Sequence, residues 1–580
     1  MMANMIQNAK DSINVLLQKA CEKAAEAGQL PAGAVLAGTV EIPKDTANGD
    51  YAANHAMTGA RALHMAPRKI AEALVQSLDL TGTWFSSVEV AGPGFINFRL
   101  GPGWYADTLG CVASEGEDYG RVDEGHGKRV MVEFVSANPT GPMHMGNARG
   151  GVLGDALASV LDRAGYQVWR EFYVNDAGNQ IEKFASSIDA RYRQLLLGED
   201  AVEFPADGYQ GEDIKDLAKA FYDEFGDSCL NKDVSERHEA MAKFGLERNI
   251  PKMQADLKRY GVEYDQWFFE SSLHESGFVA DTVKKLGERG YTYEKDGALW
   301  LKTARILTEN LLKAGKKQEE IDKLDLKDDV LKRANGFYTY FAADIAYHRN
   351  KLETRGFDCA VNVWGADHHG HVARLKGALD ALGLDGEHRL HIVLMQLVKL
   401  MSDGQEVRMS KRTGKAISLT NLLDDIPVDS ARYFFNSRPE SPVLFDLELA
   451  QRQDNENPVY YVQYAHARIC TLIENLAAEG HAVPDTVDAA LLTDETEKEL
   501  IKQLAALPDE IRLAARDYDP SRINKYVTEL AARFHRFYTV CRIKDAEPGL
   551  LEARLYLADC VRRVIAVSLA IIGVSAPERM

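Results

Sequence analysis

The chain has 580 residues, a formal net charge of −19 and a pI near 5.3. At about 100–200 residues per domain this length predicts about three to five domains. A composition of 46% hydrophobic and 27% charged residues excludes a collagen-like or mainly disordered chain. As a whole-chain average, the acidic charge counts against a nucleic-acid partner, because phosphate binding favours Lys and Arg.

The seven cysteines are widely spaced and form no Cys-x-x-Cys pair, which predicts a reducing cytoplasm without a disulfide framework or zinc ribbon. The N-terminal segment is amphipathic and interrupted by charge, unlike a secretory signal. The longest strongly apolar run, 564–574, is shorter than the roughly 20 residues that span a bilayer. We therefore expect a soluble, cytoplasmic protein.

Residues 1–116 have the pattern of a small α+β unit. Apolar spacing predicts a helix over 13–27, and Pro67 begins a second helix that runs to residue 78. Residues 88–100 read as two short strands around a Gly-Pro-Gly turn. Residues 115–127, rich in Gly, Asp and Glu, are typical of a linker.

From residue 128 the pattern becomes strand (129–135), helix (147–165), strand (168–174), which is a βαβ unit and predicts a parallel sheet. The same order returns over 359–397. One doubly wound sheet with an insertion of about 150–180 residues explains both blocks. Within the insertion, residues 199–227 hold ten acidic residues against two lysines, and we expect this segment to lie on the surface, away from any phosphate site.

Beyond residue 455 the strand patterns stop. Helical spacing covers 460–478, 495–516 with a break at Pro508, 520–540 and 550–572, which predicts a helix bundle. The sequence thus predicts three parts: an α+β domain over 1–116, an α/β domain over 117–454 with an acidic insertion near 195–330, and an all-α domain over 455–580.

The most informative stretch follows the first strand of the sheet and opens a helix: Glu133-Phe-Val-Ser-Ala-Asn-Pro-Thr-Gly-Pro-Met-His-Met-Gly-Asn147. Such a junction directs backbone N–H groups and the positive helix end at an anion. Gly141 and Gly146 allow close approach, and His144 and Asn147 add donors on one side of the first turn. The alternative is a Gly/Pro-rich surface turn with an unrelated histidine.

Two further stretches carry candidate chemistry. Arg408-Met-Ser-Lys-Arg-Thr-Gly-Lys415 places four cations within eight residues, as in an anion-binding loop or a solvated basic loop. Trp364-Gly-Ala-Asp-His-His-Gly-His371 follows a strand at the end where open α/β sheets bind ligands. A metal cluster or packing histidines are the alternatives there, and structural metal is disfavoured because no cysteine or further histidine is suitably spaced.

In this order the stretches resemble class I aminoacyl-tRNA synthetases: His144-Met-Gly-Asn147 resembles their His-x-Gly-His signature, and Arg408-Met-Ser-Lys-Arg412 their Lys-Met-Ser-Lys-Ser signature. Within that class the chain is similar over nearly its whole length to bacterial arginyl-tRNA synthetases. The residues that carry this similarity are 133–142, Tyr340-x-x-x-Asp344, Trp364–His368, Tyr461–Arg468 and Ala576–Met580. The resemblance implies a Rossmann-like catalytic sheet between a small N-terminal α+β domain and a C-terminal all-α bundle.

The resemblance implies an arginyl-tRNA synthetase activity: ATP-dependent activation of L-arginine to arginyl-adenylate, then transfer to the 3′ end of tRNA(Arg). His144, Asn147 and Lys411 are the implied catalytic residues. The implied ATP site comprises Gly141, His144, Gly146, Asn147, Gly365, Asp367, Met409, Ser410, Lys411 and Lys415. Mg²⁺ would accompany the triphosphate, held by substrate oxygens and water, and we expect no metal-ligating residues.

Two departures from the signatures affect the phosphate contacts. Asn147 replaces a histidine and cannot become cationic, and Arg408 replaces a lysine with a planar fork.

The implied substrate side chain is a guanidinium, which is planar, always charged and offers five donors, so its pocket needs a carboxylate in bidentate geometry. Tyr340 and Asp344 share a helix face if 337–352 is helical. The resemblance implies that Asp344 binds the guanidinium beside Tyr340, with Glu133, Asn138 and His368 lining the rest of the site. The alternative for Tyr340 and Asp344 is a surface helix pair.

The resemblance also implies that the N-terminal domain reads the outer corner of the tRNA, including its D-loop, through Phe95 and Asn97. The alternative is that both are strand residues of the core. Asp429-Ser-Ala-Arg432 resembles the Asp-Ala-Leu-Arg signature that leads into anticodon-binding bundles.

There, Tyr461, Tyr464 and Arg468 share a helix face suited to splayed bases, and Met580 is a further candidate; the alternative is a core stripe. The family usually needs bound tRNA before it activates arginine.

Two rival functions stay open from the sequence: another class I synthetase or nucleotidyltransferase, and a non-catalytic tRNA-binding paralogue. The expected partners are tRNA(Arg), L-arginine and ATP, without a membrane or DNA partner, in a monomer.

Overall fold

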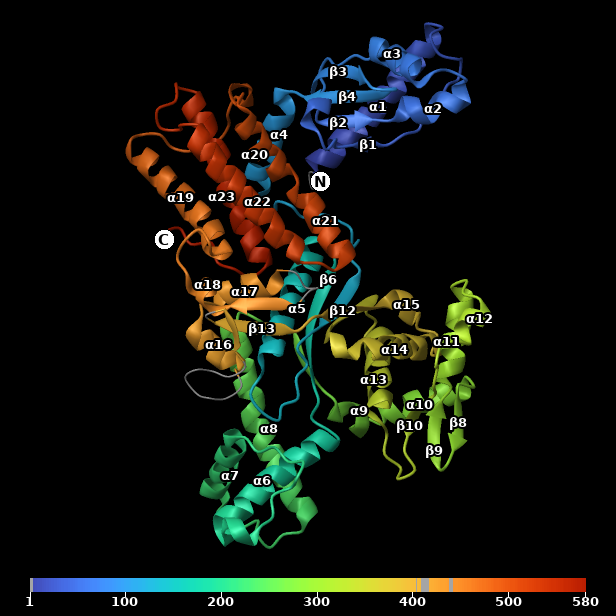
Figure 1. Cartoon of the computed structure of the whole chain (residues 1–580), viewed down its shortest axis with the longest axis vertical. Helices are drawn as coiled ribbons and strands as arrows, with labels where there is room; N and C mark the ends of the chain where they lie inside the picture. The colour runs from blue at the N-terminus through green and yellow to red at the C-terminus, as the bar shows by residue number, and fades with distance from the viewer. Residues whose placement is uncertain (1–3, 403, 408–416, 438–441) are drawn as a thin grey trace.

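The computed structural model describes residues 4–402, 404–407, 417–437 and 442–580. Figure 1 shows three parts: an N-terminal unit, a central sheet that carries two lobes, and a helical bundle. The fold class predicted from the sequence is confirmed, with the parallel sheet in the middle of the chain and helices at its C-terminal end.

The N-terminal unit packs helices against a four-stranded antiparallel sheet in the order β1-β2-β4-β3. Helix α1 begins after Asn4, whose side chain accepts from the Gln7 N–H, and buries Ala9, Ile13 and Leu17 at helical spacing. The elements are α1 (Met5–Glu26), β1 (Val40–Glu41), β2 (Tyr51–Ala53), α2 (His55–Leu63), α3 (Pro67–Ser77), β3 (Phe85–Ala91) and β4 (Phe95–Leu100). The two expected helices and the hairpin at 88–100 are confirmed.

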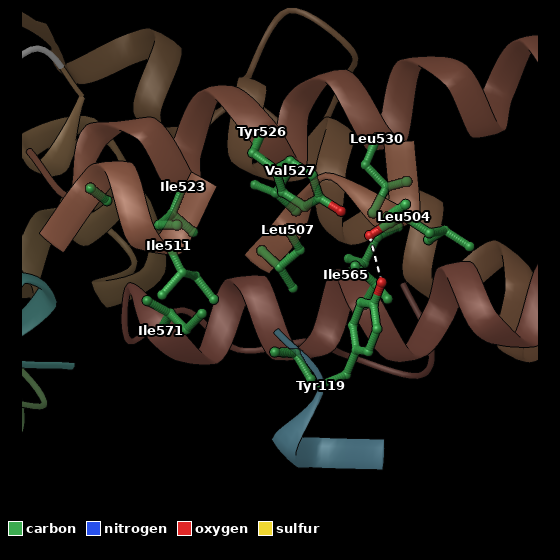
Figure 2. Packing of buried hydrophobic residues seen from close by; sticks show 14 of the residues in the cluster. Tyr119, Leu504, Leu507, Ile511, Ile523, Tyr526, Val527, Leu530, Ile565 and Ile571 are labelled. Atoms are coloured by element: carbon green, nitrogen blue, oxygen red, sulfur yellow. Dashed lines mark hydrogen bonds between the residues drawn. The ribbon is translucent and has the colours of Figure 1, made fainter. Parts of the chain in front are cut away.

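Helix α4 (Pro102–Glu115) leaves this unit and packs against the C-terminal bundle (Figure 1). Its continuation buries Tyr119 between the bundle helices, where the Tyr119 hydroxyl donates to the Leu504 carbonyl at 2.9 Å (Figure 2). Gly120 is needed beside it, because φ is +91° and a Cβ would lie 2.9 Å from Leu507. The segment predicted as a linker therefore anchors the bundle.

The central sheet is parallel throughout, in the order β12-β11-β5-β6-β7. Its strands are β5 (Arg129–Glu133), β6 (Gln167–Val174), β7 (Gln266–Phe269), β11 (Cys359–Gly365) and β12 (Leu390–Met395). Helix α5 (Met145–Arg163) links β5 to β6, and α14 (His369–Ala381) and α15 (Gly386–Arg389) link β11 to β12. Both predicted βαβ blocks are thus joined in one doubly wound sheet.

Two insertions form the lobes that extend from the sheet on the side away from the bundle (Figure 1). The first, between β6 and β7, is helical: α6 (Asn179–Leu197), α7 (Glu212–Phe225) and α8 (Val234–Arg259). The second precedes β11 and contains α9 (Ser271–Glu275), α10 (Phe278–Glu288), β8 (Thr292–Lys295), β9 (Ala298–Leu301), α11 (Thr303–Lys313), α12 (Gln318–Ile321), β10 (Asp329–Lys332) and α13 (Tyr340–Arg349). Strands β10-β9-β8 form a separate antiparallel sheet.

A small sheet, β14-β13-β15, leads from the central sheet to the bundle. Its strands are β13 (Val398–Ser402), β14 (Gln405–Val407) and β15 (Val443–Asp446). The helices in the same part of the chain are α16 (Leu419–Asp425), α17 (Val428–Asn436) and α18 (Leu447–Gln451). The bundle follows as α19 (Pro458–Ala478), α20 (Glu495–Ala505), α21 (Leu507–Asp517), α22 (Ser521–Val540) and α23 (Leu550–Ile571). The predicted break at Pro508 is the α20–α21 junction.

Arg432 joins the catalytic sheet to the bundle. It is 1% exposed, pairs with Asp155 of α5 at 2.5 Å, and donates to the carbonyls of Tyr260, Gly261 and Ile572. A buried charge of this kind is tolerated when its donors are all engaged. The Asp-Ser-Ala-Arg motif therefore acts in the structure as a connection between α5, the end of α8 and the end of α23.

No helix in the described part of the chain is long and apolar enough to cross a membrane.

Candidate active site

A large cleft lies at the carboxyl ends of β5 and β11, which are neighbours in the sheet. The chain leaves β5 toward β6 on one side and β11 toward β12 on the other, so this is the point at which the strand order reverses. Open α/β sheets bind ligands at this place. The cleft has a volume of about 2320 Å³ and lies between the two lobes.

A strained turn ends β5. Val135 and Ser136 have φ of +68° and +44°, a conformation that is unfavourable for a β-branched residue. The turn brings the Ser136 hydroxyl back to donate to Glu133 Oε1 at 2.9 Å and to accept from the Tyr173 N–H at 3.2 Å. It thereby fixes the Glu133 carboxylate at the cleft.

Helix α5 begins at the cleft with the first signature. The His144 N–H donates to Asn147 Oδ1 at 2.9 Å, so the Asn147 amide caps the helix and keeps its Nδ2 group for another acceptor. His144 is exposed, and its backbone pairs with Ser418, while the Leu419 N–H donates to the Met143 carbonyl. Met409, Ser410, Lys411 and Lys415 lie outside the described residues, but the segment that follows them runs beside the first signature.

Asp344 of α13 is 9% exposed and lines the cleft. His348 Nδ1 lies 3.0 Å from its Oδ1, and His371 Nε2 lies 2.5 Å from its Oδ2. Burial alone would raise the pKa of Asp344, but the two imidazoles hold it below its usual range. Asp344 is therefore an ionised carboxylate, and Tyr340, one turn earlier, lies exposed at the same cleft.

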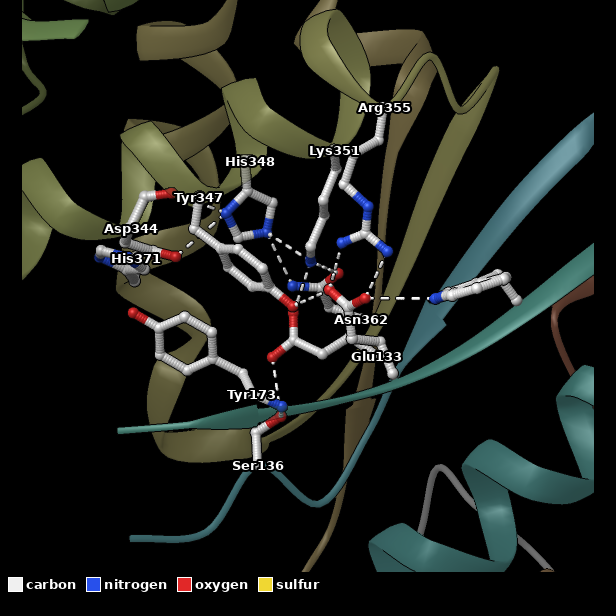
Figure 3. A network of polar contacts seen from close by, with 12 residues as sticks. Glu133, Ser136, Tyr173, Asp344, Tyr347, His348, Lys351, Arg355, Asn362 and His371 are labelled. Carbon is white, nitrogen blue, oxygen red and sulfur yellow. Dashed lines mark hydrogen bonds and ion pairs between the residues drawn. The ribbon is translucent and has the colours of Figure 1, made fainter. Parts of the chain in front are cut away.

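A buried polar network connects Asp344 to Glu133 (Figure 3). Lys351, which is fully buried, donates to Glu133 Oε2 at 2.6 Å and to Asn362 Oδ1 at 3.2 Å. This fixes the Asn362 amide so that its Nδ2 donates to His348 Nε2 at 2.8 Å. His348 Nε2 is thus an acceptor, and the proton on Nδ1 points to Asp344.

Two further buried carboxylates lie behind and beside this network. Glu171 accepts hydrogen bonds from the two terminal nitrogens of the Arg355 guanidinium at 2.9 and 2.6 Å, and from the Tyr347 hydroxyl at 2.7 Å. Glu270 lines the cleft, accepts the Tyr173 hydroxyl at 2.8 Å, and has a pKa raised by burial. Sequence reasoning predicted Glu133 and Asp344 but missed the residues that connect them, namely His348, Lys351 and Asn362. His348 and Lys351 follow Asp344 at helical spacing, which could have pointed to them.

At the end of β11, Gly365 allows the chain to turn, because a Cβ there would lie 2.6 Å from Asp367 Oδ1. Asp367 and His368 are exposed, and the His368 ring lies 5.9 Å from the Trp364 ring. Trp364 also contacts His371 at 5.7 Å between ring centroids, which links this end of the site to Asp344.

The structure brings most of the predicted small-molecule site together. The cleft is lined by Glu133, Asn138, Gly141, His144, Asn147, Tyr340, Asp344, Gly365, Asp367 and His368. Gly146 lies in the first turn of α5 but not in the lining.

The expectation that the acidic segment 199–227 lies away from this site is wrong. Glu212, Asp213 and Asp216 line the same cleft, and a Cβ at Gly141 would lie 3.3 Å from Asp213 Oδ2. Segment charge predicts exposure to solvent, but it does not predict which surface the tertiary fold places the segment against.

The two N-terminal candidates differ in exposure. Phe95 is 37% exposed, whereas Asn97 is 2% exposed in the middle of β4, with an Oδ1 that has no hydrogen-bond partner. The Asn97 amide therefore does not reach an RNA base in this conformation, which corrects its assignment as a surface contact. Phe95 stays a candidate.

In the bundle, the predicted stripe on α19 forms part of a larger aromatic surface. The Tyr461 and Tyr464 rings lie 4.7 and 6.2 Å from the His535 ring, and Arg468 lies over the Tyr538 ring at 4.1 Å. Tyr461, Tyr464 and Arg468 are each partly exposed, and Met580 is 52% exposed. A face of this kind suits unstacked bases.

Across the described residues, no group of three or more His, Cys, Asp and Glu side chains is arranged to hold a metal ion.

Three family profiles match consecutive parts of the chain. "Arginyl tRNA synthetase N terminal domain" matches residues 11–100, "tRNA synthetases class I (R), catalytic domain" matches 110–438, and "DALR anticodon binding domain" matches 462–580. The catalytic match alone covers more than half of the chain.

Two relatives match over the full length of both chains. The arginine--tRNA ligase of Caldanaerobacter subterraneus subsp. tengcongensis is 53% identical, and that of Ruminiclostridium cellulolyticum is 50% identical, each over 100% of both chains. Among solved structures, Thermus thermophilus arginyl-tRNA synthetase superposes with a TM-score of 0.71 at 21% identity, over 98% of this chain and 100% of that one. At this identity the superposition shows the fold alone.

Proposed function

The chain belongs to the arginyl-tRNA synthetase family, and on that premise we propose how its residues carry out the reaction. It is an arginine--tRNA ligase with tRNA, arginine and ATP as partners, and no observation favours the non-catalytic alternative. The observation that carries the proposed roles is the meeting of His144, Asp344 and Asp367 at one cleft, from three separate parts of the chain.

In the first step the arginine carboxylate attacks the α-phosphorus of ATP, forming arginyl-adenylate and releasing pyrophosphate. The attacking group is already ionised, so positioning and charge stabilisation matter more than a protein base. His144, the free Nδ2 of Asn147 and the first N–H groups of α5 are suited to stabilise the phosphates. We propose that Lys411 acts with them, assisted by Met409, Ser410 and Lys415.

Mg²⁺ is proposed to accompany ATP, coordinated by phosphate oxygens and water, since the described residues offer no metal cluster.

The arginine side chain is proposed to lie against Asp344. His371 occupies an acceptor site on Oδ2, and His348 Nδ1 lies within reach of both Oδ1 and the Asp344 backbone carbonyl. A carboxylate has about four acceptor sites, so at least two remain for a guanidinium. Tyr340 would cover the guanidinium plane. At the other end, Glu133 and Asn138 are suited to the α-ammonium group, with His368 beside them, and Asp367 is suited to accept from the ATP ribose.

For the tRNA, we propose that Phe95 contacts the outer corner and that Tyr461, Tyr464, Arg468 and Met580 contact the anticodon. We further propose that arginine activation requires bound tRNA. The buried connection at Arg432 supports this, because it joins the anticodon-binding bundle to α5, which begins at His144.

The enzyme is proposed to be a cytoplasmic monomer; its seven unpaired cysteines support a reducing compartment.

Arginine-dependent ATP–pyrophosphate exchange tests both parts of the proposal. With tRNA present, exchange should depend on arginine and not on lysine or citrulline, and without tRNA it should fall to background. Robust exchange without tRNA would contradict the tRNA requirement, and exchange that does not discriminate arginine from citrulline would contradict the role of Asp344.

A further inference from the structure

The mouth of the cleft has an acidic rim and a basic, aromatic rim. On the helical lobe, Glu182, Glu212, Asp213 and Asp216 face the cleft. On the opposite lobe, Arg333 and Phe337 of the turn between β10 and α13 line the cleft together with Tyr340 at the start of α13. Lys332 precedes them at the end of β10, and residues 330–343 contain no acidic side chain. In a chain with a net charge of −19, this turn is a local exception.

The turn is a rigid hairpin tip and not a loose loop. The Arg333 N–H donates to the Phe337 carbonyl at 2.9 Å, the Gly336 N–H donates to the Arg333 carbonyl at 2.9 Å, and the Thr339 N–H donates to the Leu331 carbonyl at 2.9 Å. Gly336 has a φ of +87°, which a side chain would strain. Lys332 lies over the Tyr338 ring at 5.3 Å. The backbone therefore holds the side chains at the tip in fixed directions.

Phe337 at this tip is 71% exposed, although it lines the cleft. An exposed aromatic ring beside two cations is the combination that binds single-stranded nucleic acid, since bases stack on the ring and phosphates meet the cations. Phe337 is not part of the buried core, so packing within the folded protein does not explain why an aromatic side chain stands at this position.

We propose that this tip, residues 332–337, binds the unpaired 3′-terminal nucleotides of the tRNA, with Phe337 stacking on a base and Arg333 contacting a phosphate. The proposal rests on the function proposed above, because the terminal ribose must enter this cleft to receive the arginyl group. The acidic rim repels an RNA backbone, so the strand enters over the opposite rim. The hairpin thus sets the direction from which the acceptor end reaches the adenylate.

A binding cycle tests the proposal. The dissociation constants of wild-type enzyme and of the Phe337→Leu variant are measured with intact tRNA and with tRNA that lacks its unpaired 3′ nucleotides. Removal of the nucleotides should weaken binding to wild type by about tenfold, the effect of one lost base–aromatic stack. For Phe337→Leu the truncation should weaken binding distinctly less than it does for wild type, because the stack is already lost and only the phosphate contact of Arg333 remains to be removed.

Four further variants test whether the effect is specific to the hairpin tip. Phe337→Trp should restore the difference between the two RNAs, and Phe225→Leu, an exposed phenylalanine on α7, should behave as wild type. Arg333→Gln should reduce the slope of log affinity against log salt by about one, the effect of one lost phosphate contact. Arg305→Gln on the same lobe, outside the cleft lining, should leave this slope unchanged.

The proposal is overturned if truncation of the tRNA costs Phe337→Leu as much as it costs wild type. It is also overturned if Phe337→Leu raises the arginine KM and leaves tRNA binding unchanged, which would make the ring part of the arginine site. Failure of the wild-type enzyme to arginylate tRNA would instead contradict the proposed function, so the two failures are distinguishable.

Discussion

Replacing Asp344 by Asn removes a single charge from the proposed guanidinium site and keeps the side-chain volume. The carboxylate is almost fully buried. Its Oδ2 lies 2.5 Å from His371 Nε2, and its Oδ1 lies 3.0 Å from His348 Nδ1, which also lies 2.9 Å from the Asp344 backbone carbonyl. Its remaining lone pairs face the cleft. The asparagine amide offers one acceptor oxygen in place of two. Its NH₂ group is a donor, and it would face another donor, either a histidine or the guanidinium.

The expected magnitude follows from the loss of a charge-assisted hydrogen bond, which contributes about 1.5–3 kcal/mol. This corresponds to an increase of about 10- to 150-fold in the arginine KM. The ATP KM should change by less than about twofold, because the groups assigned to ATP lie on α5 and at the end of β11.

Steady-state arginylation at saturating tRNA measures both constants. Asp367→Asn is the matched control, since it makes the same chemical change at an exposed position of the same cleft and should raise the ATP KM while it leaves the arginine KM unchanged. An arginine KM within about threefold of wild type in Asp344→Asn would refute the role of Asp344. Thermal unfolding of the variant shows whether the fold is intact.

Three other results are expected. Glu270→Gln should raise the Tm of the ligand-free enzyme at pH 8 more than at pH 5, because burial raises the pKa of Glu270 and its ionised form destabilises the fold once the pH exceeds the pKa of an ordinary glutamate; a lower Tm at pH 8 would contradict this. Arg432→Met should destabilise the enzyme by about 1.5–3 kcal/mol in denaturant titration, because Asp155 loses one of its two arginine partners and keeps only Arg170 at 3.3 Å, and adding Asp155→Asn should recover part of the loss; additive losses would argue against the pair. Burial raises the pKa of the Cys359 thiol to about 11, helped by Asp358, so at pH 8 iodoacetamide should modify Cys359 far more slowly in the native than in the unfolded protein, as peptide mass spectrometry would show.

The parts of the fold predicted best are those encoded by local patterns. The apolar run of β5, the Gly-rich junction before α5 and the helical spacing of the bundle each determine their own element, so the sequence reveals them without tertiary information. The switch point also follows from the order of strands and helices, which places Glu133 at the end of β5 and Asp367 just after the end of the neighbouring strand β11.

The parts that could not be predicted depend on contacts between distant segments. From the sequence, Lys351 is expected to be a surface cation two residues after Arg349. Its burial against Glu133 depends on the meeting of β5 with the helical turn that follows α13. The positive φ of Val135 is contrary to the preference of a β-branched residue, and only the surrounding hydrogen bonds make it necessary. Asn97 lies on one face of its strand by the alternation of side chains, but which face is buried depends on the segments that pack over it.

The most direct test of the account is arginylation of total tRNA by the purified enzyme with each amino acid in turn, in radiolabelled form, in the presence of ATP and Mg²⁺. The account predicts that arginine alone is attached to tRNA and that omission of ATP abolishes the product. Attachment of a different amino acid, or tRNA binding without any arginylation, would contradict it.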